Sequence, residues 1–203
     1  MIPSIFAVLI SYLLGSVSFS VVLAKSLKGI DIRQHGSGNA GATNTLRVLG
    51  KGPAILVLLL DVLKGIAAIW LGRWLGAGSE WIPALCGIAA IVGHNWPIYF
   101  HFRGGKGIAT TIGVMATLAF LPALYAGVIA IISIVFTRYV SLGSLIFVLL
   151  TPLFLWISGQ HGPTFWISLL ICIFAFWRHR TNIVKIVQGR ENKLGSKGGN
   201  RVA

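Results

Sequence analysis

The stretch 108–137, IATTIGVMATLAFLPALYAGVIAIISIVFT, determines how many times this chain crosses a membrane. A helix needs about 20 residues to span the hydrocarbon core, so this segment is long for one crossing and short for two. Pro122 lies in its middle, where proline disfavours continued helix. The distribution of charge in the rest of the chain therefore has to decide between the two counts.

The composition indicates an integral membrane protein. Of the 203 residues, 56% are hydrophobic and only 10% are charged, and the mean hydropathy is +0.85, whereas soluble domains carry about 25% charged residues. Backbone groups in the bilayer core must be paired within helices. We therefore expect an all-α integral membrane protein, with residues 1–203 as a single transmembrane domain and a polar tail from about residue 178. Cys86 and Cys172 lie in apolar runs and are expected to pack, not to form a disulfide.

Apolar runs on both sides of the central segment predict further membrane helices. They cover about 2–24, 53–75, 82–100, 142–158 and 164–177. The first run has no basic residue before it and no obvious cleavage site, so we interpret it as a retained helix and not as a cleaved signal peptide.

Basic residues set the predicted topology because basic loops stay in the cytoplasm. The basic loops 25–51 and 101–107 share a side under either count. Two crossings by segment 108–137 would bring Arg138 and the basic tail to that same side, leaving only Arg73 near the other face. We therefore expect seven transmembrane helices, with the amino terminus periplasmic and the carboxyl terminus cytoplasmic. Two of them, turning near Pro122, would be short, at about fifteen residues against the usual ~17 to 25.

The segment 36–47, GSGNAGATNTLR, has the composition of a phosphate-binding loop. Closely spaced glycines let several backbone N–H groups point at one anion, and polar side chains add donors. The candidate residues are Gly36, Ser37, Gly38, Asn39, Gly41, Thr43, Asn44 and Arg47. The glycine spacing also matches a dinucleotide fingerprint, but an apolar span precedes it where that motif needs a strand. A flexible polar loop between two helices is the remaining alternative.

A second glycine-rich basic segment, HFRGGKG, covers 101–107. Gly104, Gly105 and Gly107 would bend the backbone, Lys106 would supply a positive charge, and the helix expected to follow would favour an anion at its amino terminus. The segment is not a Walker A loop, because Phe100 stands where that motif needs glycine. A loop that merely anchors at lipid headgroups is the alternative.

Other polar residues lie within the predicted spans or near their ends. Asp61 and Lys64, spaced i and i+3, are expected to form a buried ion pair, since each alone would cost about 2.5 to 3.5 kcal/mol at mid-span. His94 is either a substrate ligand or a histidine satisfied by a neighbouring helix. The remaining candidates lie near the starts or ends of helices: Ser141 and Ser144, of which Ser141 is expected to cap a helix, and His179 and Asn182, at i and i+3.

Five motifs together resemble the bacterial acyl-phosphate-dependent glycerol-3-phosphate acyltransferases of the PlsY type. They are GSGNAGATNTLRVLGK, LDVLKG, GHNWPIYFHFRGGKGIAT, RYVSLGS and RHRTNIVKIVQGRE. The resemblance implies a seven-helix enzyme of the bacterial inner membrane with its active site facing the cytoplasm. It implies transfer of a fatty acyl group from acyl phosphate to the 1-hydroxyl of sn-glycerol 3-phosphate. This reaction gives lysophosphatidic acid and phosphate, the first acylation of phospholipid biosynthesis. A phosphate:acyl carrier protein acyltransferase would supply the donor.

The sequence offers no obvious general base for this reaction, and the reaction is not expected to require one. Only four acidic residues occur, and they offer no carboxylate pair for general acid–base catalysis. None of the five histidines is followed by aspartate five positions later, so the His-x-x-x-x-Asp dyad of other glycerolipid acyltransferases is missing. We expect direct transfer with His179, Asn182, Lys106 and Ser37 in catalytic roles. Substrate binding is assigned to the glycines of both loops and to His94, Asn39, Thr43, Asn44, Arg47, Ser141 and Ser144. No cofactor, metal or nucleic acid is expected.

Two other classes remain possible from the residues alone. A transporter of organic phosphates would place its sites at mid-membrane on broken helices, usually in two related halves, and no such repeat is visible. A lipid-binding module would explain the basic face through anionic headgroups, but it would not need the glycine and asparagine positions.

Overall fold

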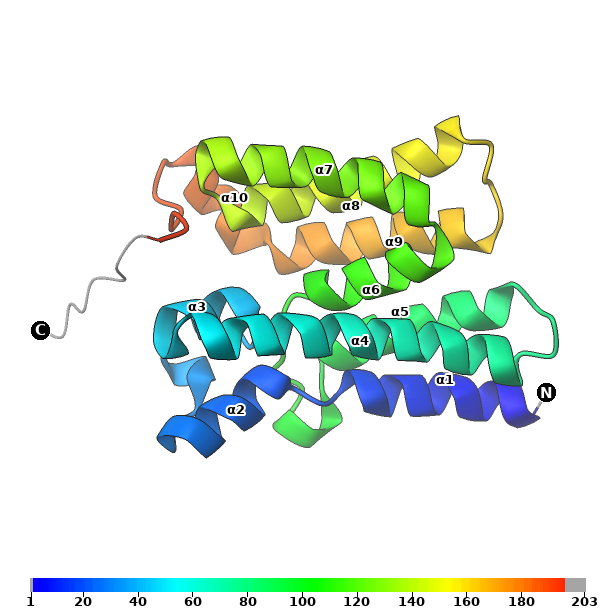
Figure 1. Cartoon of the computed structure of the whole chain (residues 1–203), viewed down its shortest axis with the longest axis horizontal. Coiled ribbons are helices and arrows are strands. Elements are labelled where there is room, and N and C mark those ends of the chain that lie inside the picture. The colour runs from blue at the N-terminus through cyan, green and yellow to red at the C-terminus, as the bar shows by residue number, and fades with distance from the viewer. Residues whose placement is uncertain (1, 196–203) are drawn as a thin grey trace, which may run out of the picture.

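The computed structural model describes residues 2–195, and these residues form helices and loops without a strand (Figure 1). The α-helices are α1 (Ile2–Gly15), α2 (Phe19–Lys28), α3 (Ala42–Leu49), α4 (Lys51–Leu75), α5 (Trp81–Asn95), α6 (Ile108–Leu118), α7 (Phe120–Thr137), α8 (Val140–Ile157), α9 (Pro163–Arg178) and α10 (Arg180–Val187). Two short 3-10 helices, η1 (Ile32–Gln34) and η2 (Ile98–Phe100), lie in the loops.

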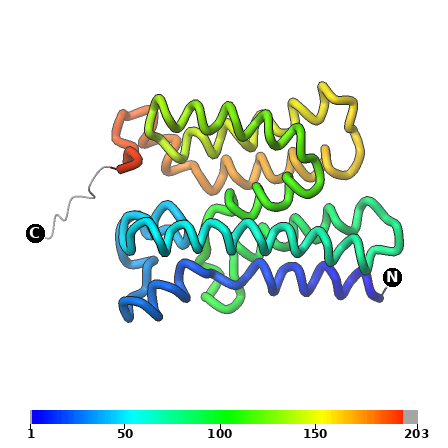
Figure 2. Tube along the Cα trace, viewed as in Figure 1, coloured from blue at the N-terminus to red at the C-terminus, as the bar shows by residue number. Residues whose placement is uncertain are grey.

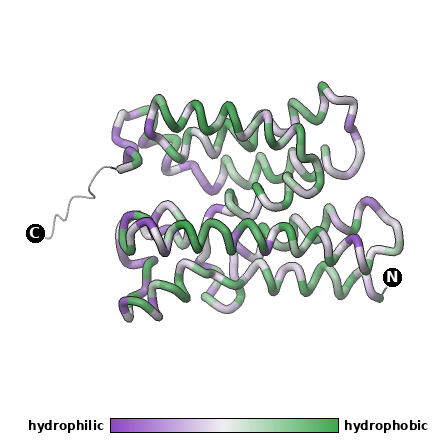
Figure 3. Tube along the Cα trace, in the orientation of Figure 1, coloured by the Kyte–Doolittle hydropathy of each residue, from purple (hydrophilic) through white to green (hydrophobic). Residues whose placement is uncertain are grey.

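The helices form two groups joined by α6. Helices α1, α4 and α5 pack together in one group, α7, α8 and α9 form the other, and α6 contacts both α4 and α7 (Figures 1 and 2). The start of α1 and the turns α4–α5 and α8–α9 lie at one end, whereas α3, α10 and residues 188–195 lie at the other. Hydrophilic residues concentrate at the two ends and hydrophobic ones between them (Figure 3). This distribution is that of a membrane-embedded helix bundle.

Glycines let the helices approach closely. A Cβ added at Gly65 of α4 would lie 2.4 Å from the carbonyl oxygen of Thr110 on α6, and one at Gly15 of α1 would lie 2.1 Å from that of Ala90 on α5. In a bilayer the hydrophobic effect does not drive helices together, because the lipid tails are themselves apolar. Small residues at helix crossings instead let the backbones approach closely enough to pack. The α1–α5 and α4–α6 interfaces therefore depend on these glycines.

Among the described residues, four helical segments are long and apolar enough to span a bilayer: Ile2–Lys28, Lys51–Leu75, Phe120–Thr137 and Val140–Ile157. A fifth is obtained if α9 and α10, which meet at 62°, count as one bent span. Helices α5, with 15 residues, and α6, with 11, are shorter than these four segments. A helix the length of α6 extends only about 17 Å.

The predicted first span, about 2–24, lies within the apolar segment Ile2–Lys28, but it is not one continuous helix, because the chain breaks at Ser16–Ser18 between α1 and α2. A broken helix leaves backbone groups without a helical partner. Here the ammonium group of Lys64 donates to the carbonyl oxygen of Val17 at 2.9 Å. The break is stabilised by a charge from another helix, so the local sequence carries no clear sign of it.

The central segment does form two helices, as predicted, but they meet at Ala119 and not at Pro122. Pro122 lies in the first turn of α7, where its missing N–H would have no helical partner. The two helices therefore have 11 and 18 residues and not about fifteen each.

The predicted polar loops also contain structure. Residues 25–51 include η1 and α3, the tail begins with α10, and α5 ends at Asn95, before the predicted limit at residue 100. The expectation that Ser141 caps α8 is wrong: Tyr139 is the residue before the helix, and the Ser141 hydroxyl donates to Glu191.

Candidate active site

The loop 36–41 is shaped by Asn44, which is fully buried. The amide nitrogen of Asn44 donates to the carbonyl oxygens of Ile32 and His35 at 3.1 and 3.0 Å, and its oxygen accepts from the Ser37 N–H at 2.8 Å. Gly36 has a φ of 61°, and a Cβ there would lie 2.3 Å from that same amide oxygen. The expectation that Asn44 binds substrate is corrected, since its hydrogen-bonding groups hold the loop.

The second loop, Gly104–Gly107, packs directly against the first. The Gly104 and Gly105 N–H groups donate to the carbonyl oxygens of Asn95 and His94 at 3.2 and 3.1 Å. A Cβ at Gly105 would lie 2.6 Å from the carbonyl oxygen of Ala40. The two glycine-rich segments, far apart in sequence, therefore meet at one place.

Arg178, at the end of α9, ties the last span to this second loop. Its guanidinium donates to the carbonyl oxygen of Gly105 at 2.6 Å and to that of Gly104 at 3.2 Å. It also lies 5.5 Å from the centre of the Trp96 ring, a cation–π contact. The carbonyl groups of Gly104 and Gly105 thus accept from Arg178, while their N–H groups donate to Asn95 and His94, so the backbone of these two glycines is held within the protein.

Lys106, Asn182 and Glu191 form a chain of polar contacts from the loop to the tail. The ammonium group of Lys106 donates to the side-chain oxygen of Asn182. The Asn182 amide nitrogen donates to Glu191 Oε1 at 2.8 Å, and the Ser141 hydroxyl donates to the same oxygen at 2.9 Å. Because a carboxylate only accepts, Glu191 fixes which way the Asn182 amide points and directs its oxygen to Lys106.

Cations gather around this chain. Burial, together with the charges of Arg178, Arg47 and Lys185, lowers the pKa of Lys106 to about 8 against the opposing charge of Glu191. Burial also lowers the pKa of Arg47, and the negative charge of Glu191 partly offsets this lowering. At pH 7 both groups are charged, so the site has an excess of positive charge suited to a phosphate.

His179 lies at the junction of α9 and α10 and is 3% exposed. Its Nδ1 lies 2.8 Å from the carbonyl oxygen of Ala175 and must carry the proton, because a carbonyl only accepts; Nε2 is left as an acceptor. Burial, aided by the charge of Lys106, lowers the pKa of His179 to about 4. His179 is therefore a neutral imidazole at pH 7.

Other predicted ligands are placed less favourably. His94 is buried behind Gly105 and contacts Lys64, so we reassign it from substrate binding to support of the loop. The Ser144 hydroxyl donates to the Val140 carbonyl oxygen of its own helix, and Ser141 is held by Glu191. The remaining candidates lie in or beside the loops: Ser37 and Gly38 exposed, Asn39 and Thr43 half-buried, Gly41 at the start of α3, and Gly107 at the start of α6.

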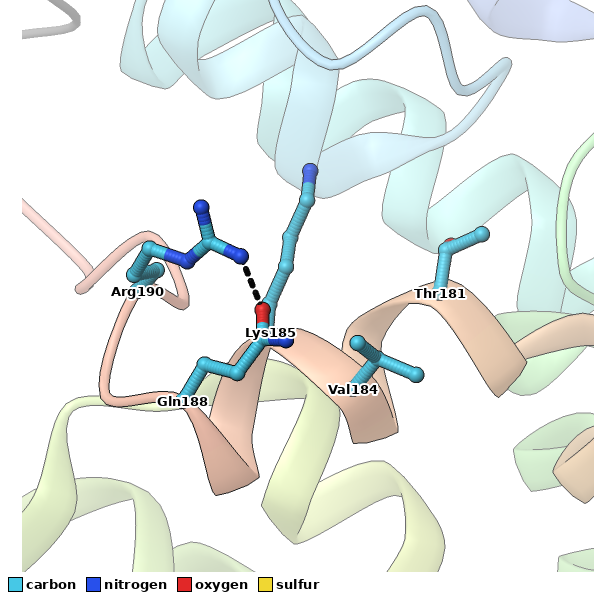
Figure 4. A pocket seen from close by; sticks show the side chains of 5 residues that line it. All are labelled: Thr181, Val184, Lys185, Gln188 and Arg190. Carbon is cyan, nitrogen blue, oxygen red and sulfur yellow. Dashed lines mark hydrogen bonds between the residues drawn. The ribbon is translucent and has the colours of Figure 1, made fainter.

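A shallow depression of about 360 Å³ lies along α10 beside these cations. Its lining residues are Thr181, Val184, Lys185, Gln188 and Arg190. In Figure 4 the Lys185 side chain extends across it, and the Arg190 guanidinium donates to the Gln188 side chain. The charge of Lys185 reaches Lys106, so the depression adjoins the polar site.

Sequence reasoning missed two residues of this site. Glu191 was treated only as one of the few acidic residues, although an acidic residue in so basic a tail, following RHRTN, signals a paired role. Arg178 is one of several basic residues in the tail, and only the fold shows that it holds the second loop.

Fold and site together define an all-helical integral membrane protein with cations gathered where two glycine-rich loops meet. Residues 5–189 match the family model described as glycerol-3-phosphate acyltransferase. The chain therefore belongs to the glycerol-3-phosphate acyltransferase family and is an acyltransferase.

Curated relatives of the same name are similar over nearly their full length. The glycerol-3-phosphate acyltransferase of Shouchella clausii is 61% identical over 203 residues, covering 97% of this chain and 99% of the relative. That of Halalkalibacterium halodurans is 60% identical, with coverages of 92% and 93%.

Two solved structures share the fold. The glycerol 3-phosphate form of PlsY (YgiH), an integral membrane glycerol 3-phosphate acyltransferase, has a TM-score of 0.89 and 39% identity over 95% of this chain and 96% of that one. Its lysophosphatidic acid form has a TM-score of 0.86 and 38% identity, with coverages of 96% and 97%.

Proposed function

We propose that this acyltransferase moves a fatty acyl group from acyl phosphate to the 1-hydroxyl of sn-glycerol 3-phosphate, releasing lysophosphatidic acid and phosphate. One observation carries the proposal: the two cationic glycine loops meet and are joined to the α9–α10 junction through Lys106 and Asn182. Two phosphorylated substrates need two neighbouring anion sites. The related PlsY has forms with glycerol 3-phosphate and with lysophosphatidic acid, which are an acceptor and a product of this reaction.

The proposed roles follow from the charges and hydrogen bonds. Arg47 and Lys106 bind phosphate oxygens, with Asn182 and Ser37 adding side-chain contacts. Loop N–H groups complete the anion sites, apart from those that donate within the protein, which are the N–H groups of Ser37, Gly38, Gly41, Gly104 and Gly105. Because Asn182 is fixed by Glu191, its oxygen holds Lys106 in place. Thr43 and Asn39 are secondary candidates for the acceptor.

His179 orients the acceptor and does not act as a strong base. Its Nε2 accepts a hydrogen bond from a glycerol hydroxyl, since Nδ1 donates to Ala175. An imidazole with a pKa of about 4 is a weak base at pH 7, whereas phosphate monoesters have a second pKa near ~6. A substrate phosphate oxygen is therefore the better destination for the hydroxyl proton. Acyl phosphate has a good leaving group, so positioning and charge stabilisation supply most of the acceleration.

The chain is further proposed to cross the bacterial inner membrane seven times with the site facing the cytoplasm. The basic residues of both glycine loops lie at the end of the bundle that holds α3, α10 and residues 188–195. Basic loops stay in the cytoplasm. The opposite end, with the α4–α5 turn, has Arg73 and Glu80 near it. The amino terminus, at that opposite end, would be periplasmic.

The donor is tested by incubating purified protein with glycerol 3-phosphate and palmitoyl phosphate, palmitoyl-CoA or palmitoyl acyl carrier protein in separate reactions. The proposal expects lysophosphatidic acid from palmitoyl phosphate alone. Product formed only from a thioester donor would overturn the choice of donor while leaving the family assignment intact.

A further inference from the structure

Three ionisable side chains form a buried cluster behind the second glycine loop. Asp61, Lys64 and His94 are 1%, 2% and 6% exposed. The ammonium nitrogen of Lys64 lies 2.8 Å from Asp61 Oδ1 and 3.0 Å from His94 Nδ1, and it donates to the Val17 carbonyl oxygen at 2.9 Å. The predicted Asp61–Lys64 ion pair is confirmed, and it has two further partners.

Lys64 determines the orientation of the His94 ring. A lysine ammonium only donates, so Nδ1 of His94 accepts and the ring proton lies on Nε2. A Cβ added at Gly105 would lie 2.1 Å from this Nε2, and one at Gly104 would lie 2.0 Å from the His94 carbonyl oxygen. The imidazole therefore fills the space that a side chain at residue 105 would need and supports the loop from behind.

The cluster connects three parts of the chain. Lys64 of α4 reaches the break between α1 and α2 through Val17, and His94 places the end of α5 against the loop. Buried ion pairs are poor stabilisers compared with apolar packing, and the α4–α6 and α1–α5 interfaces already pack through glycine. Ionisable residues within membrane spans are functional by default. Their position behind the anion-binding loop indicates which function they serve.

We propose that Asp61, Lys64 and His94 are positioning residues that hold the Gly104–Gly107 loop in the conformation that binds glycerol 3-phosphate, an inference that rests on the proposed function. The loop is assigned to this substrate because the charge of Lys106 acts on His179, the residue proposed to orient the glycerol. Asp61 neutralises Lys64 and fixes its ammonium group. Lys64 orients the ring, and the ring sets the position of Gly105 and hence of Lys106 beside it. None of the three touches substrate.

The test uses His94→Asn, which leaves the Asp61–Lys64 pair intact, together with Lys64→Met and the double variant. Cys86→Ala, a change at a buried residue on the same helix α5, is the matched control. Binding of glycerol 3-phosphate is measured by calorimetry on purified full-length protein without a donor. KM for each substrate, kcat and the thermal midpoint are measured alongside.

His94→Asn is expected to weaken glycerol 3-phosphate binding and to raise its KM about tenfold or more, since small misplacements of a binding group are costly. KM for palmitoyl phosphate should change less than about twofold, and Lys64→Met should add little in the His94→Asn background because both act through one contact. Wild-type affinity in His94→Asn, equal rises in both KM values, or losses that only follow the thermal midpoint would overturn the proposal. If wild type binds glycerol 3-phosphate but gives no product from palmitoyl phosphate, the proposed donor is wrong. The calorimetry would still test whether Asp61, Lys64 and His94 position the loop, because it measures glycerol 3-phosphate binding without a donor.

Discussion

Replacing Glu191 with alanine should damage the site far from the residue's own position in the sequence. Glu191 Oε1 accepts from Asn182 Nδ2 at 2.8 Å and from the Ser141 hydroxyl at 2.9 Å. Hydrogen bonds to a charged group contribute about 1.5 to 3 kcal/mol each. Without the carboxylate, the Asn182 amide is oriented by the Lys106 ammonium alone and loses the acceptor that holds its nitrogen.

The loss at Asn182 gives the size of the effect. If about 2 to 3 kcal/mol of that contact is lost in the transition state, kcat/KM should fall roughly 30- to 150-fold. Glu191→Gln keeps an acceptor but removes the charge that supports protonated Lys106, so it should lose less, about tenfold or under. Ser141→Ala breaks the other contact and leaves Asn182 held, so its loss should be smaller still.

The assay is release of lysophosphatidic acid from palmitoyl phosphate and glycerol 3-phosphate at pH 7, with folded protein quantified by thermal melting. The expected order of damage is Glu191→Ala, then Glu191→Gln, then Ser141→Ala. A Glu191→Ala enzyme that keeps its wild-type fold and loses less than about threefold in kcat/KM would refute the role given to this contact chain.

Three further outcomes are expected. His179→Gln should retain substantial turnover, because glutamine can still hydrogen-bond to the acceptor; near-total loss with intact glycerol 3-phosphate binding would instead identify His179 as a base. Lys106 has a pKa of about 8, so its ammonium group loses the proton as pH rises through that value. KM for glycerol 3-phosphate should then rise up to ~tenfold per pH unit above it. In Lys106→Arg this KM should not change with pH, and a wild-type KM that stays constant to pH 10 would contradict the role of Lys106. In a Cys86→Ala/Cys172→Ala background, an impermeant thiol reagent on intact cells should label Ser79→Cys and not Gln188→Cys, and the reverse labelling would invert the proposed orientation.

Much of the helical architecture could be predicted from the sequence, because spans depend on length and hydropathy. The positions of α4, α8 and α9 agree with the predicted runs to within a few residues. The i, i+3 spacing of Asp61 and Lys64 correctly predicted their ion pair. The start of α6 after the second glycine loop was also predicted correctly.

The failures occur where tertiary contacts override local patterns. The break at Ser16–Ser18 depends on a donor 47 residues away, so the apolar run gives no signal for it. The turn predicted near Pro122 falls at Ala119, three residues earlier, because proline is tolerated in a first helical turn.

The candidate site was predicted as a set of residue types more reliably than as a set of roles. Both glycine loops, Lys106 and Asn182 come together as expected. Asn44 and His94 carry hydrogen-bonding groups that suit a ligand equally well, and only the fold shows that these groups are used within the protein. Glu191 was missed because its partners, Ser141 and Asn182, meet it only after α8 and α10 pack.

The most direct test of the account is a structure of this protein with glycerol 3-phosphate and a non-transferable acyl phosphonate bound together. The account predicts both phosphorus atoms at the meeting point of the two glycine loops, with Arg47 and Lys106 in hydrogen-bond contact with their oxygens and His179 Nε2 facing the glycerol. Phosphorus atoms held on opposite faces of the bundle, or away from Arg47 and Lys106, would contradict it.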